Sequence, residues 1–172
     1  TTIQAPAKEV YIQLVQLANF NKWAVWGQND TSIRYTLSGK DGIINTSSTW
    51  KGDPQLSGEG KITITALEEN KKVGQAIEFI APQKGKATSV FLLGEKNERT
   101  TVTWTFSKAT PRPWNIFNLM ADLDKQMGKD FEEGLVALKS TVEKAAGNET
   151  FTDYKVVALN FPATTFATVR QQ

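Results

Sequence analysis

The sequence predicts an α+β domain in which a curved antiparallel sheet of six to seven strands wraps around one long C-terminal helix. Residues 114–146 carry apolar side chains at steps of three and four, which is the period of an α-helix. Many of the residues before them alternate between apolar and polar side chains, which is the period of a strand. Short turn sequences separate these runs, so we expect successive strands to pair antiparallel.

The long helix is predicted over residues 114–146. Pro111 and Pro113 exclude a helix directly before it, because proline lacks an amide hydrogen and fixes φ. A helix of roughly 33 residues rises about 50 Å, which is enough to cross a domain of this size. Its predicted buried face carries Phe117, Met120, Asp124, Met127, Phe131, Leu135, Leu138 and Val142. The opposite face is charged, as expected of a helix with one side in solvent.

The elements before this helix are predicted from the same two periods. Two short helices are expected after the first strand, one beginning at Pro6 and one over residues 19–26, which contain two tryptophans. The predicted strands cover residues 1–5, 33–37, 43–51, 60–67, 73–81, 87–93 and 101–107. The run 87–93 is apolar in both phases, which predicts a strand covered on both sides.

The composition excludes several classes of function. The chain contains no histidine and no cysteine, which excludes Ser-His-Asp and Cys-His catalysis, zinc sites built from those residues and thiol redox chemistry. We therefore expect no metal and no cofactor. A formal net charge of +2 with scattered lysines and arginines argues against a nucleic-acid partner. No run approaches 18 apolar residues, so no membrane span is predicted within the chain.

Several motifs occur in an order that points to a known superfamily. They are residues 5–10, residues 19–26, Trp50-Lys51-Gly52, Gly58-Glu59-Gly60, residues 101–104 and residues 124–135. Together with the order of the elements over residues 1–147, they resemble the START-like helix-grip superfamily (SRPBCC; polyketide cyclase/dehydrase and lipid transport). The resemblance implies a cavity between sheet and helix that holds a hydrophobic small molecule. Some branches are enzymes and many are not, so the fold does not decide the function.

Residues 148–172 form an extended tail that is too short to bury a core of its own. Its predicted strands, within residues 154–170, either extend the sheet, pair with another chain, or begin a second domain, and we favour the last. The tail resembles the opening hairpin of a gyrase-inhibitor-like effector-binding domain. Relatives with that pair of domains often carry an N-terminal membrane segment. Such a segment would fit the start of the sequence at Thr1 without methionine. The localisation stays open between a cytoplasmic protein and one tethered to a membrane by an upstream segment.

The candidate ligand-binding residues are aromatic, flexible or polar side chains expected to face the interior. They are Trp26, Tyr35, Trp50, Phe79, Trp104, Met120, Asp124, Met127 and Phe131. Methionine is flexible where a rigid core would favour leucine or isoleucine. Gly128 and Gly134 each cost about 1 kcal/mol within a helix, which is tolerated where bare backbone allows close approach or leaves room. The alternative for each aromatic residue is ordinary core packing.

Asp124 and Tyr35 are the two candidate catalytic residues. Asp124 shares the phase of the buried face, so its carboxyl group is a candidate general acid or hydrogen-bond anchor, with Tyr35 as its partner. The alternative is an edge position where Asp124 pairs with a lysine. The favoured function is non-catalytic binding of a hydrophobic or amphipathic molecule by a carrier or sensor. The alternatives are a cyclase/dehydratase-like enzyme and a protein-interaction module of the chaperone-ATPase-activator type.

Overall fold

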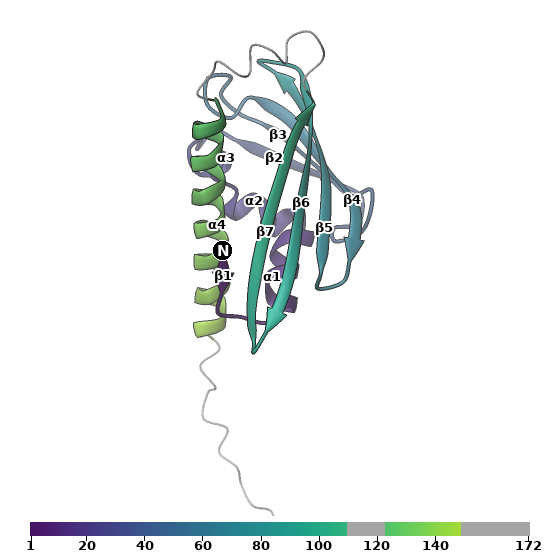
Figure 1. The fold of residues 1–172 in the computed structure, drawn as a ribbon. Helices are drawn as coiled ribbons and strands as arrows, with labels where there is room; N and C mark the ends of the chain where they lie inside the picture. Colours follow the sequence, from purple (N-terminus) through teal and green to yellow (C-terminus); the bar gives the residue numbers. More distant parts are fainter. Residues whose placement is uncertain (110–122, 149–172) are drawn as a thin grey trace, which may run out of the picture.

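A computed structural model describes residues 1–109 and 123–148 of the chain (Figure 1). Its elements, in chain order, are β1 (Thr2–Ile3), α1 (Ala7–Val15), α2 (Leu17–Trp23), α3 (Val25–Gln28), β2 (Arg34–Ser38), β3 (Ser47–Lys51), β4 (Glu59–Glu68), β5 (Lys72–Ala81), β6 (Gly85–Lys96), β7 (Arg99–Ala109) and α4 (Leu123–Asn148). The strands form one seven-stranded antiparallel sheet, so the predicted α+β class is confirmed.

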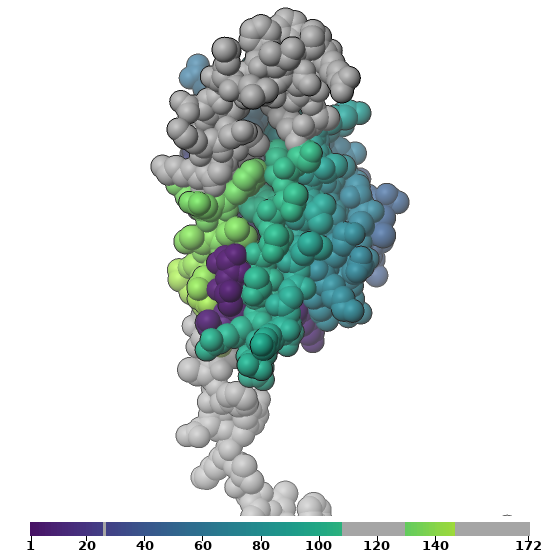
Figure 2. Space-filling model, viewed as in Figure 1, coloured from purple at the N-terminus to yellow at the C-terminus, as the bar shows by residue number. Residues whose placement is uncertain are grey.

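The sheet is curved, and the helices lie on its inner side. The strand order is β1-β7-β6-β5-β4-β3-β2, so the first two strands of the chain form the two edges. Figure 1 shows α4 running along the open side of the sheet, where it contacts α1, α2, α3 and β1. β1, purple in Figure 2, lies at the surface between α4 and β7. The predicted arrangement of a sheet wrapped around the C-terminal helix is therefore confirmed.

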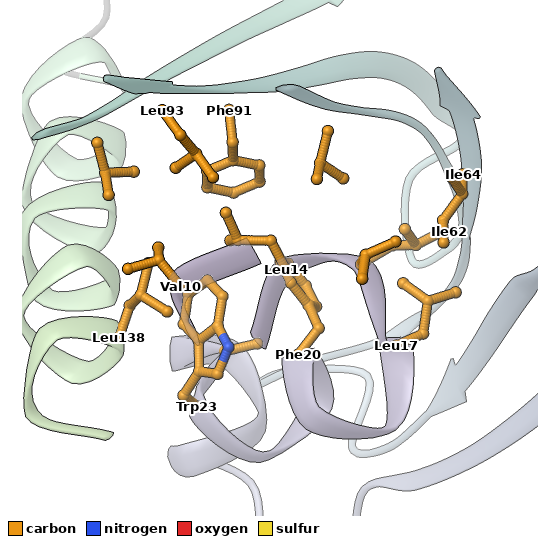
Figure 3. Close-up of a cluster of buried hydrophobic side chains, with 14 of the residues drawn as sticks. Val10, Leu14, Leu17, Phe20, Trp23, Ile62, Ile64, Phe91, Leu93 and Leu138 are labelled. Atoms are coloured by element: carbon orange, nitrogen blue, oxygen red, sulfur yellow. The ribbon is translucent and has the colours of Figure 1, made fainter. Parts of the chain in front are cut away.

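Four aromatic side chains pack together in the interior, and we call them the aromatic core: Phe20, Trp23, Phe91 and Trp104. Phe91 stacks on Trp104 with ring centroids 4.8 Å apart. Phe20 and Trp23, both from α2, meet edge to face at 4.7 Å. Figure 3 shows Leu138 of α4 and Leu14 of α1 pointing towards these rings. The aromatic core thus joins the sheet to three helices.

The helix phases agree with the prediction over the part of α4 whose side chains are described. Leu138 and Val142 are buried, and Phe131 and Leu135 are partly buried. The predicted helix start and the tail after residue 148 lie outside the described residues. Near the N-terminus, three short helices replace the predicted two, because the extended ψ of 125° at Ala24 separates α2 from α3.

The prediction for the strand over residues 43–51 is wrong in its first half. The strand begins at Ser47, and Ile43 and Ile44 lie exposed in the preceding loop. The carboxylate of Asp41 accepts hydrogen bonds from the N–H groups of Leu17 and Ala18 at the start of α2. These bonds hold the loop against the helix. Three loop residues adopt a positive φ that extended chain does not allow: Gly39, Gly42 and Asn45.

The prediction that β6 is covered on both sides is also wrong. Ala87, Ser89, Phe91 and Leu93 are buried on the inner face, whereas Leu92 between them is 47% exposed. All the described helices lie on the inner side of the sheet, so an apolar residue on the outer face meets solvent.

Candidate ligand cavity

A cavity of about 230 Å³ lies between the inner face of the sheet and α4. Strands β3, β5 and β7 supply its walls, the loop between β3 and β4 supplies part of its rim, and α4 closes one side. Its lining, among the described residues, consists of Trp50, Leu56, Ser57, Ile77, Phe79, Phe106, Asp130 and Phe131. Four of these eight side chains are aromatic, and a single one, Asp130, is charged.

The Trp50 side of the cavity depends on a glycine in the neighbouring strand. Trp50, Gly60 and Phe79 are consecutive partners across β3, β4 and β5. The Trp50 ring occupies the space where a Gly60 side chain would lie. Its Nε1–H donates to the carbonyl of Ser57 at 3.0 Å, and the ring meets Phe79 edge to face at 6.0 Å. The motif Gly58-Glu59-Gly60 therefore has a structural role here, since Gly60 makes room for an aromatic wall.

Phe131 of α4 connects the cavity to the aromatic core. Its ring lies 5.0 Å from Phe106, which lines the cavity, and 4.7 Å from Trp104, which does not. The Nε1–H of Trp104 donates to the hydroxyl of Ser89 at 2.8 Å. A side chain on Gly134 would begin 3.0 Å from the Trp104 ring, so the close approach predicted for this glycine is confirmed.

Asp30 fixes the loop that forms the rim of the cavity, and the sequence analysis did not identify it. Its carboxylate accepts the hydroxyl and the N–H of Ser32 at 2.6 and 2.9 Å. It also accepts the hydroxyl of Ser57 and, at 2.8 Å, the N–H of Asp53. The Ser32 hydroxyl first, and then the Ser57 hydroxyl, hold the pKa of this carboxyl well below its usual range. The signal in the sequence is Asp30-Thr31-Ser32, a spacing typical of a local side-chain-to-backbone turn.

The lowered pKa of Asp30 predicts a pH dependence of stability. A carboxyl whose pKa is lower in the folded state stabilises the fold above its unfolded pKa, which is about 4. That contribution is lost as the pH falls below this value towards the folded pKa. We therefore expect the urea midpoint of Asp30→Asn to lie below that of the wild type at pH 6 and to approach it towards pH 3.

Asp53→Asn is the control, because Asp53 lies in the β3–β4 loop that Asp30 holds and its side chain is exposed. Its difference from the wild type should be smaller at pH 6. A difference between Asp30→Asn and the wild type that stays constant from pH 6 to pH 3 would contradict the assigned role of the Asp30 carboxylate.

The predicted ligand-binding residues fall into three groups. Trp50, Phe79 and Phe131 line the cavity together. Trp104 belongs to the aromatic core, and Tyr35 lies beside Trp50 as its partner between β2 and β3. Met120 lies outside the described residues, and the side chains of Trp26, Asp124 and Met127 are not described. The roles of these four residues stay predictions.

Tyr35 has a hydroxyl group with an unusual environment. The oxygen is buried, has no hydrogen-bond partner among the described residues and fills the space beside Gly27. Burial, and then the negative charge of Asp30, raise the pKa of Tyr35 to about 12. The phenol therefore stays protonated at neutral pH and can act as a hydrogen-bond donor.

Five lining residues were not named as candidates from the sequence. Apolar and polar residues alternate along β5 and β7, and this pattern places Ile77 and Phe106 on the inner face of the sheet. The same pattern could have identified them as lining residues. Leu56, Ser57 and Asp130 carry no such signal, because two lie in a loop and the third lies on the polar side of α4.

Neither a metal site nor a membrane-spanning helix is found in the described part of the chain. Within residues 1–109 and 123–148, no three acidic side chains come together as metal ligands would. None of the helices in these same ranges is both long and apolar enough to cross a membrane.

Comparison with known proteins identifies the fold and no closer relationship. No protein-family model and no curated protein matches the sequence. Three solved structures illustrate the likeness. Ara h 8.0201 is 12% identical, with 84% of this chain and 94% of that chain covered and a TM-score of 0.55. The Mll3558 protein from Rhizobium loti is 13% identical, with coverages of 81% and 91% and a TM-score of 0.61.

The third structure, the Aha1 dimer from Colwellia psychrerythraea, is 17% identical, with coverages of 83% and 92% and a TM-score of 0.54. At these identities the likeness shows the fold alone, and the chain has the helix-grip fold.

Proposed function

We propose that the protein binds a small, mainly apolar molecule in the cavity between the sheet and α4, as a non-catalytic carrier or sensor. The observation that carries this proposal is the ring of four aromatic side chains around the cavity: Trp50, Phe79, Phe106 and Phe131. Protein interiors are packed about as densely as organic crystals, and rings that face empty space lose dispersion contacts. A bound apolar molecule would restore those contacts.

The size and charge of the cavity restrict the ligand. A volume of about 230 Å³ is below the roughly 300–1,000 Å³ of typical small-molecule sites, which favours a ligand of one or two rings or a short chain. Asp130 is exposed, so its charge lies at the rim. The described walls beyond it are neutral, which favours a ligand without a buried charge.

Membership of the START-like superfamily is part of the same proposal, and the helix-grip fold supports it. A second domain beginning in residues 148–172 also stays a prediction, as does pairing of another chain with strands in 154–170. No described feature favours the cyclase-like alternative, since the side chain of Asp124 lies outside the described residues.

Filling the cavity tests the proposal directly. Ile77 lines the cavity from β5, so Ile77→Phe places a larger side chain inside it. The probe is 1-aminonaphthalene, a neutral two-ring molecule whose fluorescence reports the polarity around it. We expect the wild type to bind the probe and Ile77→Phe to bind it at least tenfold more weakly, a difference of about 1.4 kcal/mol.

Ile80→Phe is the matched control, because Ile80 lies in the same strand with its side chain exposed. This variant should bind the probe like the wild type, and far-ultraviolet circular dichroism should show both variants folded. Equal binding by a folded Ile77→Phe and the wild type would refute the cavity as the binding site. Separately, native mass spectrometry of protein isolated from its own host would identify any natural ligand by its mass.

A further inference from the structure

Gln75 of β5 places an unpaired amide group in the interior of the domain. The side chain is 1% exposed, and neither its oxygen nor its nitrogen has a hydrogen-bond partner among the described residues. Leaving a buried amide unpaired costs free energy, and nearly all buried polar groups in folded proteins are paired. The amide of Gln75 therefore requires an explanation that the described residues do not supply.

The register of the sheet places Gln75 directly beside residues that line the cavity, although its amide is not itself part of that lining. Ile64, Gln75, Ser89 and Phe106 are consecutive partners across β4, β5, β6 and β7. Phe106 in this row lines the cavity. Side chains two apart on a strand share a face, so Gln75 is also the inner neighbour of Ile77, another lining residue.

On the side of Gln75 away from Ile77, the neighbouring set of cross-strand partners belongs to the aromatic core. Val73, Phe91 and Trp104 are consecutive partners across β5, β6 and β7, and Phe91 and Trp104 are stacked. Gln75 and Ser89 therefore form a polar boundary between the residues that line the cavity and the aromatic core. An apolar pair at this position would have continued the packing without any cost of desolvation.

Ser89 adds a second polar group to this boundary. Its side chain is fully buried, and its oxygen accepts the Nε1–H of Trp104. A hydroxyl that accepts a hydrogen bond can still donate its own proton. The boundary thus offers an amide donor, an amide acceptor and a hydroxyl donor, and none of these groups carries a charge.

We propose that Gln75 is the polar anchor for the ligand of the cavity, and that the ligand carries a neutral group with both a donor and an acceptor, such as a primary amide, a lactam or a protonated carboxylic acid. This inference rests on the proposed function. The apolar body of the ligand contacts the four aromatic rings, and its polar end pairs with the Gln75 amide. The ligand is then amphipathic, with the polar group bound beside Gln75.

Two matched probes separate this role from simple burial. Naphthalene-2-carboxamide carries the required group, and 2-isopropenylnaphthalene has nearly the same shape without it. Their affinities are measured by displacement of 1-aminonaphthalene. In the wild type we expect the amide probe to bind more tightly. In Gln75→Leu the amide probe should bind about tenfold more weakly, and the isopropenyl probe as tightly as before or more tightly.

Gln75→Met is a second variant of similar shape, so the result does not depend on one replacement. Both variants should unfold at a higher temperature than the wild type in the absence of ligand, because they remove an unpaired buried amide. Gln4→Leu is the matched control at an exposed position, and it should preserve the preference for the amide probe.

The outcomes distinguish this inference from the function on which it rests. Binding of both probes with the same preference in the wild type, Gln75→Leu and Gln75→Met would overturn the anchor role and leave the cavity as a binding site. Failure of 1-aminonaphthalene and of both probes to bind the wild type would overturn the two proposals together. A loss confined to the amide probe in both variants supports the anchor.

Discussion

Replacing Phe91 by alanine should lower the free energy of unfolding by about 3–5 kcal/mol, the range found when a buried phenylalanine is truncated. Phe91 is fully buried and neighbours three other rings, of which Phe20 and Trp23 are labelled in Figure 3. It stacks on Trp104, and Phe20 and Trp23 meet it edge to face at 6.3 and 6.5 Å. The surrounding rings come from both the sheet and α2, so the space left by truncation cannot close without moving whole elements.

Urea unfolding at 25 °C measures this loss. Leu92→Ala is the matched control, because Leu92 is the next residue in β6 and faces outwards. Its effect should stay within about 0.5 kcal/mol. Similar losses in the two variants would mean that the aromatic core is not the main packed region of the fold.

Gly60→Val should lower the free energy of unfolding by about 3 kcal/mol, near the upper end of the usual cost of overpacking. A side chain at Gly60 would overlap the ring of Trp50 and would begin 2.6 Å from the backbone oxygen of Glu78. Neither neighbour is the free end of a flexible chain, because the Trp50 ring is held by its hydrogen bond to Ser57. The variant should also weaken binding of 1-aminonaphthalene, because Trp50 is part of the cavity wall and its ring would have to move.

Gly94→Val is the matched control for this strand position. Among the described residues, no atom beyond the two chain neighbours lies within 4 Å of a Cβ placed at Gly94, and valine suits a strand. Its unfolding free energy should stay equal to that of the wild type or rise. A wild-type urea midpoint for Gly60→Val would show that Trp50 does not need the space above this glycine.

Much of the fold follows from residue periodicity. The alternation of Ile62 and Ile64 in β4, and of Val102, Trp104 and Phe106 in β7, predicts which side chains face the interior. The step of three and four along α4 predicts that Leu138 and Val142 are buried. These patterns are informative because one face of each element is covered and the other is not.

The errors arise where a backbone conformation or a neighbouring layer overrides the pattern. Ile43 and Ile44 look like part of a strand, but residues with positive φ on either side of them turn the chain into a loop. The run 87–93 is apolar in both phases, yet nothing in its own composition reveals that the described helices cover a single side of the sheet. Local sequence does not encode the presence of a second covering layer.

The candidate cavity was only partly predictable, because its lining depends on contacts between elements that lie far apart in the sequence. Aromatic residues on inner faces were identified as candidates, and Trp50, Phe79 and Phe131 do line the cavity. Gln75 was overlooked, although it is a polar residue in the same phase as Val73 and Ile77. Asp30 acts on a loop 23 residues away, and only the folded chain reveals that partnership.

The glycine at position 134 has a consequence for the mobility of α4. Gly134 brings the backbone of α4 against Trp104, and Leu138 and Val142 anchor the following turns. This half of the rod cannot slide or rotate without opening the aromatic core. If the cavity takes up a molecule, we therefore expect this half of α4 to stay in place.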